Sequence, residues 1–192
     1  MNTLFKPALA IAAMSMMALG AFAQGPKAGT GSVTVGGEPM YPMKNIIENA
    51  VNSKDHTTLV AAVKAAGLVE TLQGKGPFTV LAPTNNAFGA LPAGTVDGLL
   101  KPEAKGTLTT VLTYHVLAGR FDMKAIAEAI MKGGGKVSMK TVAGQELSFS
   151  MNGPNNILVW DATGAYANIS TYDVLQSNGV IHVIDRVLMP KM

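Results

Sequence analysis

The residues best suited to chemistry in this chain are its three histidines, His56, His115 and His182. An imidazole can bind a metal or carry a proton near neutral pH. No two of the three are four residues apart and no His-Glu-x-x-His motif occurs, so no helical metal site is predicted. His182 lies inside an apolar run, which favours a core histidine whose ring nitrogens are hydrogen-bonded. His56 falls in the first turn of an expected helix, where we predict a surface or capping role.

The other reactive groups form no catalytic motif. The chain has no Gly-x-Ser-x-Gly sequence, and the Gly-Lys-Gly turn that begins at Gly74 lacks the further residues of a phosphate-binding loop. Asp161, Asp173 and Asp185 lie in or between the expected late strands, and we expect Asp185 to accept hydrogen bonds from backbone or hydroxyl groups. With no cysteine, thiol catalysis and cysteine-bound metal clusters are excluded. The sequence therefore predicts no enzyme, no metal site and no cofactor.

The charge distribution argues against a nucleic-acid partner. The 192 residues include 15 basic and 12 acidic side chains, and the basic ones are scattered along the chain. A nucleic-acid-binding domain usually gathers its positive charge into a patch or a stripe. The length suits one domain with a substantial core.

Residues 1–23 have the pattern of a secretory signal peptide. Lys6 supplies a positive charge, the apolar run Ala8–Leu19 follows, and Ala-Phe-Ala at residues 21–23 fits a cleavage site. The apolar run is too short to span a bilayer, which takes roughly 20 residues. We therefore expect cleavage after Ala23, export to the periplasm or the extracellular medium, and no membrane span.

The remainder of the chain divides into a leader and one domain. Residues 24–39 are glycine-rich, which indicates a flexible leader, and the domain is expected over residues 40–192. Within it, apolar residues recur at helical spacing up to the triple glycine that ends at Gly135, and at strand spacing from Lys136 onward. Helices in the first half and antiparallel strands in the second indicate an α+β fold.

Two local predictions concern how the helices of the first half begin and end. Asp55 or Thr57 is expected to cap a helix that stops at Gly67, where a left-handed residue is favoured. Residues Tyr114–Leu117 are expected to form a short strand, and Asp122 to cap the helix that follows it.

The run Val180–Leu188 is apolar on both faces of an expected strand. Side chains alternate between the two faces of a strand. Apolar residues at both odd and even positions therefore indicate a central strand that is covered on both sides. The Asn178-Gly179 pair before it is typical of a tight turn.

Three segments in this order resemble the signature blocks of the fasciclin domain. They are GPFTVLAPTNNAF at Gly76–Phe88, TYHVLAGRF at Thr113–Phe121 and SNGVIHVIDRVLMP at Ser177–Pro190. With the helical opening before them, the resemblance covers roughly Met43–Pro190. It implies a β-wedge of antiparallel strands packed beside a layer of helices, and a non-enzymatic role in adhesion to cells, matrix or surface glycans.

The resemblance also implies roles for particular residues. Tyr114 and His115 correspond to a block implicated in binding, although packing with hydrogen-bonded ring groups is the more common role for such a pair. The residues that we expect to be structural are Phe78, Pro83, Thr84, Asn85, Phe88, Asn178, Gly179, His182 and Asp185. In the first block, Pro83 should end a strand, Thr84 should cap the next helix, Asn85 should bond turn backbone, and Phe88 should enter the core.

Two functions remain open at this point. The first is an exported binding module for surface proteins or glycans, acting in cell–cell, matrix, biofilm or host contact. The second is a periplasmic carrier of a small apolar ligand held between the sheet and the helices. The carrier is suggested by a high apolar content with only six phenylalanines, since packing of small residues can leave a cavity.

Overall fold

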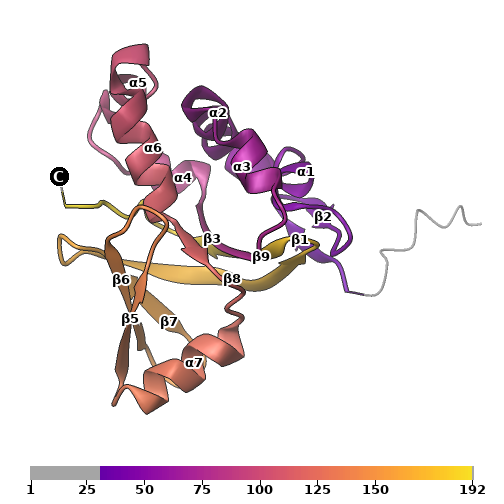
Figure 1. Ribbon diagram of the computed structural model, residues 1–192, viewed down its shortest axis with the longest axis vertical. Coiled ribbons are helices and arrows are strands. Elements are labelled where there is room, and N and C mark those ends of the chain that lie inside the picture. Colours follow the sequence, from indigo (N-terminus) through magenta and orange to yellow (C-terminus); the bar gives the residue numbers. More distant parts are fainter. Residues whose placement is uncertain (1–30, 192) are drawn as a thin grey trace, which may run out of the picture.

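The computed structural model describes residues 31–191, which form a layer of helices above a strongly curved sheet (Figure 1). The α-helices are α1 (Ile46–Ala50), α2 (Thr57–Ala66), α3 (Val69–Gln73), α4 (Asn85–Gly89), α5 (Thr95–Leu99), α6 (Lys105–Tyr114) and α7 (Met123–Lys132). Two short 3-10 helices, η1 (Lys54–His56) and η2 (Pro102–Ala104), precede α2 and α6. The strands are β1 (Val33–Val35), β2 (Glu38–Met40), β3 (Phe78–Pro83), β4 (Val116–Ala118), β5 (Lys136–Lys140), β6 (Glu146–Met151), β7 (Ile157–Trp160), β8 (Tyr166–Gln176) and β9 (Gly179–Ile184).

Seven strands form the main sheet in the order β4-β3-β9-β8-β7-β6-β5. Every neighbouring pair is antiparallel except β3 and β9, which run parallel in register from Phe78 opposite Gly179 to Pro83 opposite Ile184. A single bridge between Leu117 and Thr141 links the two edges and curls the sheet towards closure. The α+β wedge is therefore confirmed, with one parallel pair that the sequence did not predict. Parallel neighbours need a long crossover, and here nearly a hundred residues separate β3 from β9.

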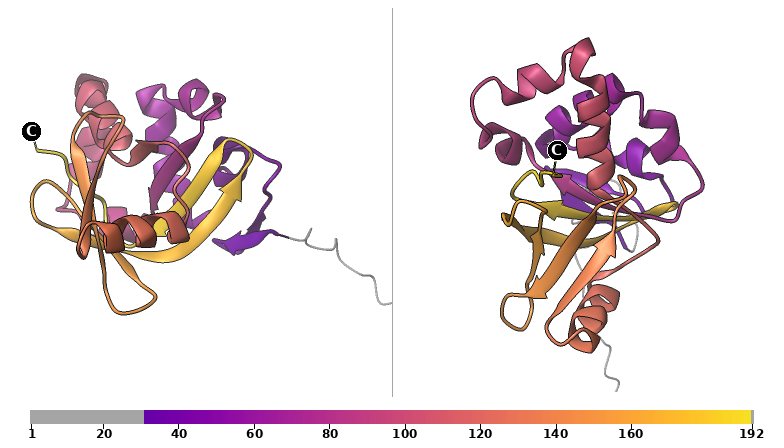
Figure 2. Two further views of the ribbon diagram at one scale, coloured as in Figure 1. Left: turned by 60° about the horizontal axis from the view of Figure 1, so that its bottom comes forward. Right: turned by 60° about the vertical axis from the view of Figure 1, so that its left-hand side comes forward.

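The strand β9 lies in the interior of this sheet, between β3 and β8, and all six of its residues are buried. It ends at Ile184, earlier than the run to Leu188 suggested. Its two faces contact different clusters of apolar side chains. One cluster lies under the helices α1, α2 and α6, and the other fills the curled half of the sheet, where α7 packs against β5 and β6 (Figure 2).

Part of the expected flexible leader is ordered. The strands β1 and β2 form a hairpin within residues 33–40, and both contact β8. Val35 and Met40 are 7% and 3% exposed, so the hairpin contributes apolar side chains to the core below the helices. The prediction of a flexible segment up to Pro39 is therefore wrong from Val33 onward, because the apolar side chains of the hairpin are covered by the core and by β8. The expected signal peptide, residues 1–23, and residues 24–30 lie outside the described residues.

The local predictions for helices were partly right. Gly67 ends α2 with φ +75°, and the Asp122 carboxylate accepts the Ala125 N–H at 2.7 Å to begin α7. Tyr114, expected in a strand, is instead the last residue of α6, so the strand β4 begins only at Val116. Neither Asp55 nor Thr57 caps α2 with its side chain.

Among the helices within residues 31–191, none is both long and apolar enough to cross a bilayer.

Candidate functional site

The three signature segments lie side by side in space. They supply the strands β3, β4 and β9, which are consecutive in the sheet although they are far apart in the sequence. Backbone bonds join them also at their ends: Leu81 N donates to His115 O at 2.9 Å, and Thr84 N donates to Ile184 O at 3.3 Å. The blocks therefore form one half of the sheet, from its edge strand β4 inward to β9.

Residues of the first block end β3 and start α4. Pro83 is the last residue of β3 and is buried, and Phe78 is half-buried at the other end of the strand. The Thr84 hydroxyl accepts the Ala87 N–H at 3.3 Å and caps α4. Phe88, 7% exposed, packs in the cluster under the helices.

Asn85 holds a neighbouring helix, whereas the sequence predicted a bond within its own turn. Its side-chain oxygen accepts the Thr58 N–H at 3.0 Å and the Thr57 hydroxyl at 3.1 Å, and its amide donates to Lys54 O at 2.8 Å. An oxygen in this position satisfies the free N–H groups of a helix start. Asn85 thus supplies the cap of α2 that Asp55 or Thr57 was expected to provide.

Asn178 links the start of β9 to two helices. Its side-chain oxygen accepts the Ile46 N–H at 3.0 Å, and its amide donates to Leu72 O and Gly74 O, each at 2.8 Å. The side chain is therefore fully used by backbone groups of α1, α3 and the turn after α3. Gly179, next to it, lies directly against the backbone of Phe78.

Tyr114 and His115, the candidate binding pair, are both inside the protein, with exposed fractions of 0% and 3%. The Tyr114 hydroxyl donates to Glu146 O and accepts the Ala162 N–H, both at 2.9 Å. Burial raises the pKa of this phenol. The pair connects the end of α6 to β6 and to the loop after β7, and neither ring lies at the surface.

His115 is held as a neutral ring with its proton on Nδ1. Its Nε2 accepts the Leu188 N–H at 2.9 Å, so the proton is on Nδ1, which donates to Val111 O at 2.7 Å. Burial lowers the pKa of His115 to about 4, and the Val111 carbonyl and Asp161 oppose this only in part. His115 therefore stays uncharged at neutral pH and fastens the C-terminal segment to α6.

We expect Tyr114→Phe to lower the free energy of unfolding by about 1–3 kcal/mol, because it removes a buried hydroxyl that bonds two partly buried backbone groups, the Glu146 carbonyl and the Ala162 N–H. Urea unfolding of both proteins measures the difference. Surface binding should be unchanged at temperatures where both are folded. Lost binding with unchanged stability would instead make Tyr114 a contact residue.

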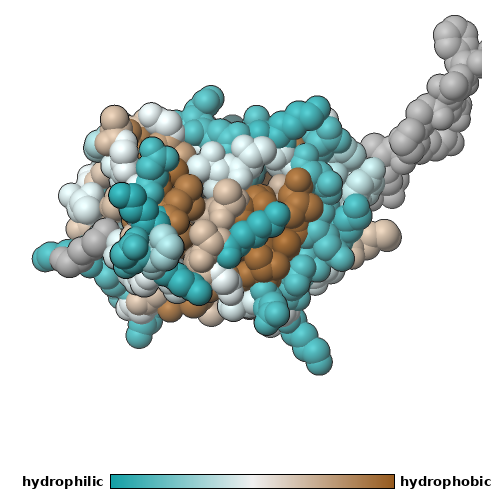
Figure 3. All heavy atoms as spheres, turned by 90° about the horizontal axis from the view of Figure 1, so that it is seen from above, coloured by the Kyte–Doolittle hydropathy of each residue, from teal (hydrophilic) through white to brown (hydrophobic). Residues whose placement is uncertain are grey.

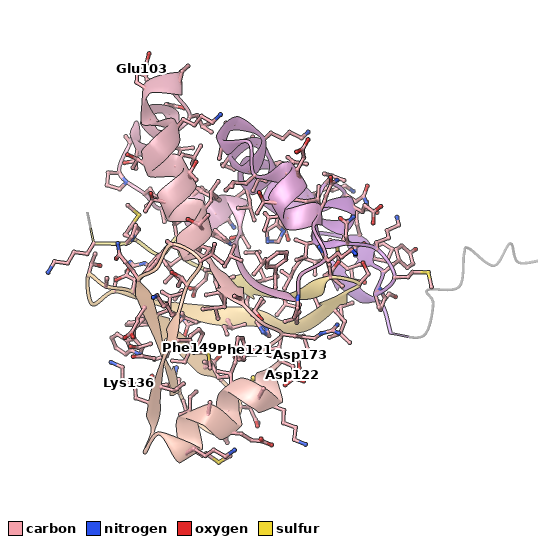
Figure 4. The ribbon with its side chains drawn as sticks, viewed as in Figure 1. Glu103, Phe121, Asp122, Lys136, Phe149 and Asp173 are labelled. Atoms are coloured by element: carbon pink, nitrogen blue, oxygen red, sulfur yellow. The ribbon has the colours of Figure 1, made fainter. Side chains whose placement is uncertain are left out.

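His182 is a second fully buried histidine with both ring nitrogens hydrogen-bonded. Nδ1 accepts the Asp173 N–H at 3.3 Å and Nε2 donates to Phe121 O at 2.8 Å. Burial lowers its pKa, while the Phe121 carbonyl, Asp173 and Asp122 act in the opposite direction. Asp173, with φ +53°, also accepts the Met123 N–H at 2.7 Å, so this group anchors the start of α7 on β8 (Figure 4).

Asp185 lies just beyond β9 and is exposed. Its two carboxylate oxygens accept from Asn168, one from the backbone N–H and the other from the side-chain amide, each at 2.8 Å. Asp161 similarly accepts from Thr163, Ala165 and Met189. These carboxylates are occupied by neighbouring groups of the scaffold.

The described residues offer no assembled metal site. Within 31–191, no group of three histidine or carboxylate side chains is placed to hold a metal ion. The polar residues of the signature segments bond mainly to backbone groups, so their chemistry is used to hold the strands and helices together.

His56 was predicted to be a surface or capping residue, and this prediction is wrong. It is 3% exposed, its Nδ1 lies 2.8 Å from the Ser53 hydroxyl, and its Nε2 has no hydrogen-bond partner among the described residues. Burial lowers the pKa of His56. The backbone of Ala82 lies near the ring and offsets this effect in part, but it is not placed to form a hydrogen bond with Nε2. The first-turn position carried no signal of burial, because it is the packing of η1 against the sheet that encloses the ring.

An apolar groove lies between the helices and the sheet, next to His56. Its walls come from α1, α2 and α3, its floor comes from β3 and β9, and it encloses a cavity of about 80 Å³. Figure 3 shows the helix side of the molecule, where apolar side chains reach the surface in patches between polar ones. We call the space between the helices α1–α3 and the strands β3 and β9 the apolar groove.

The side of strands β5–β8 that faces away from the core carries a pair of aromatic residues, Trp160 and Tyr166. Side chains alternate along these strands, so Phe149 and Val159 point into the core while Ser150 and Trp160 point outward. The rings of Trp160 and Tyr166 lie 5.0 Å apart, Trp160 Nε1 donates to the Ser150 hydroxyl at 2.8 Å, and Tyr166 is 46% exposed.

Lys136, from the edge strand β5, extends over the Trp160 ring with its Nζ 5.7 Å from the ring centroid. Together with Asn168, which pairs with Leu158 on the neighbouring strand, these residues form a polar surface around the two rings. We call the set Lys136, Ser150, Trp160, Tyr166 and Asn168 the outer sheet face.

Comparison with known proteins identifies relatives over most of the chain. The fasciclin domain family model matches residues 54–190. A Synechocystis protein, sll1483, is 48% identical over 147 residues, covering 77% of this chain and 74% of its own length. The cell surface glycolipoprotein MPB83 of Mycobacterium bovis is 33% identical over 166 residues, covering 84% of this chain and 66% of its own.

A solved structure has the same fold. The FAS1 domain pair from the insect cell adhesion molecule fasciclin I aligns with a TM-score of 0.67 at 18% identity, over 77% of this chain and 51% of that one. The order of the three signature segments, their assembly into adjacent strands and these matches lead to one conclusion: the chain belongs to the fasciclin domain family.

Proposed function

We propose that this protein is an exported, non-enzymatic binding module that attaches to proteins or glycans at a cell surface. Fasciclin domains are generally binding modules, and the relatives include a cell surface glycolipoprotein and, by fold, a cell adhesion molecule. The signal-peptide pattern of residues 1–23, with cleavage after Ala23, supports delivery to the periplasm or the extracellular medium.

The observation that carries the proposal is the contrast between the signature residues and the outer sheet face. Tyr114, His115 and His182 are enclosed and bonded internally, so a macromolecule cannot reach them without opening the fold. Trp160 and Tyr166, in contrast, lie on the outward side of the sheet. Large aromatic side chains at a surface are the residues most often found at the centre of binding sites.

The chemistry of the outer sheet face suits a flat, partly polar partner. Aromatic rings offer apolar faces that stack against C–H groups, and the surrounding serine, asparagine and lysine groups can donate or accept hydrogen bonds. The ring of Trp160 is fixed by its bond to Ser150, so little conformational entropy is lost on binding.

Binding to intact cells of the producing species tests this proposal. We expect the labelled mature protein to be retained at concentrations that leave an unrelated exported protein unbound. Tyr166→Ala should weaken retention by about tenfold, the loss of one favourable contact. The matched control is Leu175→Ala, which removes another exposed apolar side chain from the same strand, 39% exposed against 46% for Tyr166.

Two outcomes would contradict the proposal in different ways. Retention no better than that of the unrelated protein removes surface binding altogether. Retention could also fall equally in Tyr166→Ala and Leu175→Ala while both variants stay as stable as the parent. That result would keep surface binding but show that the outer sheet face is not the binding site.

A further inference from the structure

The apolar groove has the features of a ligand site, and it shares no residue with the outer sheet face. Its lining is made almost entirely of aliphatic side chains, among them Ile46, Ala50, Val63, Leu72, Val80 and Ile181. A well-packed core leaves few voids larger than a water molecule, whereas this one encloses about 80 Å³. Apolar cavities of this kind stay dry and take apolar molecules.

The size of the cavity limits what can enter it. An apolar cavity of roughly 150 Å³ in another protein binds a benzene-sized molecule. The enclosed space here is about half of that, so it suits a narrow aliphatic chain better than a ring. The half-buried rim residues Ala50 and Val60 leave an opening through which the remainder of such a chain could extend.

One buried polar atom in the lining has no partner. His56 Nε2 is enclosed and makes no hydrogen bond with any described residue, whereas both nitrogens of His115, which also lines the groove, are occupied. A buried polar group without a partner costs about 1–3 kcal/mol, which a ligand oxygen could recover. With the Ser53 hydroxyl donating to Nδ1 over 2.8 Å, the ring proton lies on Nε2, so the missing partner is a hydrogen-bond acceptor.

The charge of the lining argues for a neutral ligand. No aspartate or glutamate lines the groove, and its one charged residue, Lys64, is exposed at the C-terminal end of α2. His56 lies at the opposite end of that helix, some eight residues away, or about 12 Å along the axis. A charged head group next to His56 would therefore be buried without a counter-ion, which is strongly unfavourable.

We propose that the apolar groove binds a neutral aliphatic molecule with a single oxygen, such as a fatty alcohol, whose oxygen accepts a hydrogen bond from His56 Nε2 while its chain fills the cavity. This site gives a location to the apolar ligand that the sequence suggested as an alternative. It is independent of surface binding, so either can be present without the other.

Methyl-resolved NMR titration of the purified protein with 1-octanol tests the site. We expect saturable shifts of the Val63, Leu72 and Ile181 methyl groups, and none at Ile126 and Ile130, which belong to the other core cluster. Octanoate should bind at least about tenfold more weakly, because its charge would be buried. Shifts at neither set, or tighter binding of octanoate, would overturn the proposal.

Two pairs of variants separate the ligand site from the scaffold. His56→Phe keeps a ring but removes the N–H, and should weaken octanol binding by about tenfold; because it also removes the partner of the Ser53 hydroxyl, binding is compared at a temperature where both proteins are folded. Ala50→Phe should fill the groove and abolish binding, while Ala61→Phe, on the exposed side of α2 and outside the lining, should leave it intact. Equal binding by Ala50→Phe and Ala61→Phe would place octanol elsewhere.

Discussion

Gly179→Ala is expected to lower the free energy of unfolding by about 3 kcal/mol or more. A Cβ atom at this position would overlap the carbonyl oxygen of Phe78, at well under 3.0 Å, and would lie 3.0 Å from the carbonyl carbon of the same residue. These are backbone atoms of β3, the parallel neighbour of β9, and they cannot move without disturbing the central pair of the sheet. Since a domain of this size has only about 5–15 kcal/mol of stability, the effect should be large in urea unfolding.

Gly106→Ala provides the matched control for this prediction. Gly106 lies in the first turn of α6, where a Cβ would meet no atom within 4 Å. Alanine is favoured over glycine in a helix, so this variant should be unchanged or more stable by about 0.5–1 kcal/mol. If Gly179→Ala were as stable as Gly106→Ala, the close approach of β9 to β3 would be wrong.

Stability is expected to fall steeply between pH 6.5 and pH 5, well above the range in which carboxylates are usually protonated. His115 has a pKa of about 4 in the folded protein against 6.5 for a free histidine, because burial favours its neutral form. The unfolded chain therefore binds more protons in this range, so stability is complete above pH 6.5 and is lost as the pH falls towards 4. His115 alone accounts for about 2 kcal/mol by pH 5.

The other two histidines should add to this loss, because burial lowers the pKa of His56 and of His182 as well. Urea unfolding at half-unit steps from pH 7.5 to pH 5 measures the slope. In His115→Gln the slope should decrease by about 1.2 kcal/mol per pH unit near pH 5.5, although the variant is less stable than the parent at pH 7.5. A parent protein with constant stability over this range would show that His115 is protonated in the folded state.

Both predictions concern residues of the signature segments, which are built tightly into the scaffold. The signature segments place their polar groups where backbone atoms of other elements need partners, as His115 does for Leu188 and Asn178 does for Ile46. Such bonds make the segments sensitive to substitution even if none of them touches a ligand. Sequence similarity in these segments therefore identifies the scaffold more directly than it identifies a binding site.

Sequence patterns were sufficient to predict the α+β class and the interior position of β9, and the three signature segments were sufficient to recognise the family. The class and the strand position follow from local information: the change from helical to strand spacing at Lys136, and the apolar residues at both odd and even positions of Val180–Ile184. The helix starts at Thr84 and Asp122 and the end at Gly67 also follow from residues within one turn of each other. Such features need no knowledge of the rest of the chain.

Features that depend on partners distant in sequence become visible only in the folded chain. Asn85 caps α2 from 27 residues away, His56 is enclosed by the sheet, and the hairpin before Met40 is ordered by its contact with β8. The apolar groove and the outer sheet face are likewise made by elements that no spacing connects. The physical reason is that burial and hydrogen-bond satisfaction are properties of the assembled chain, whereas propensity and periodicity are properties of a segment.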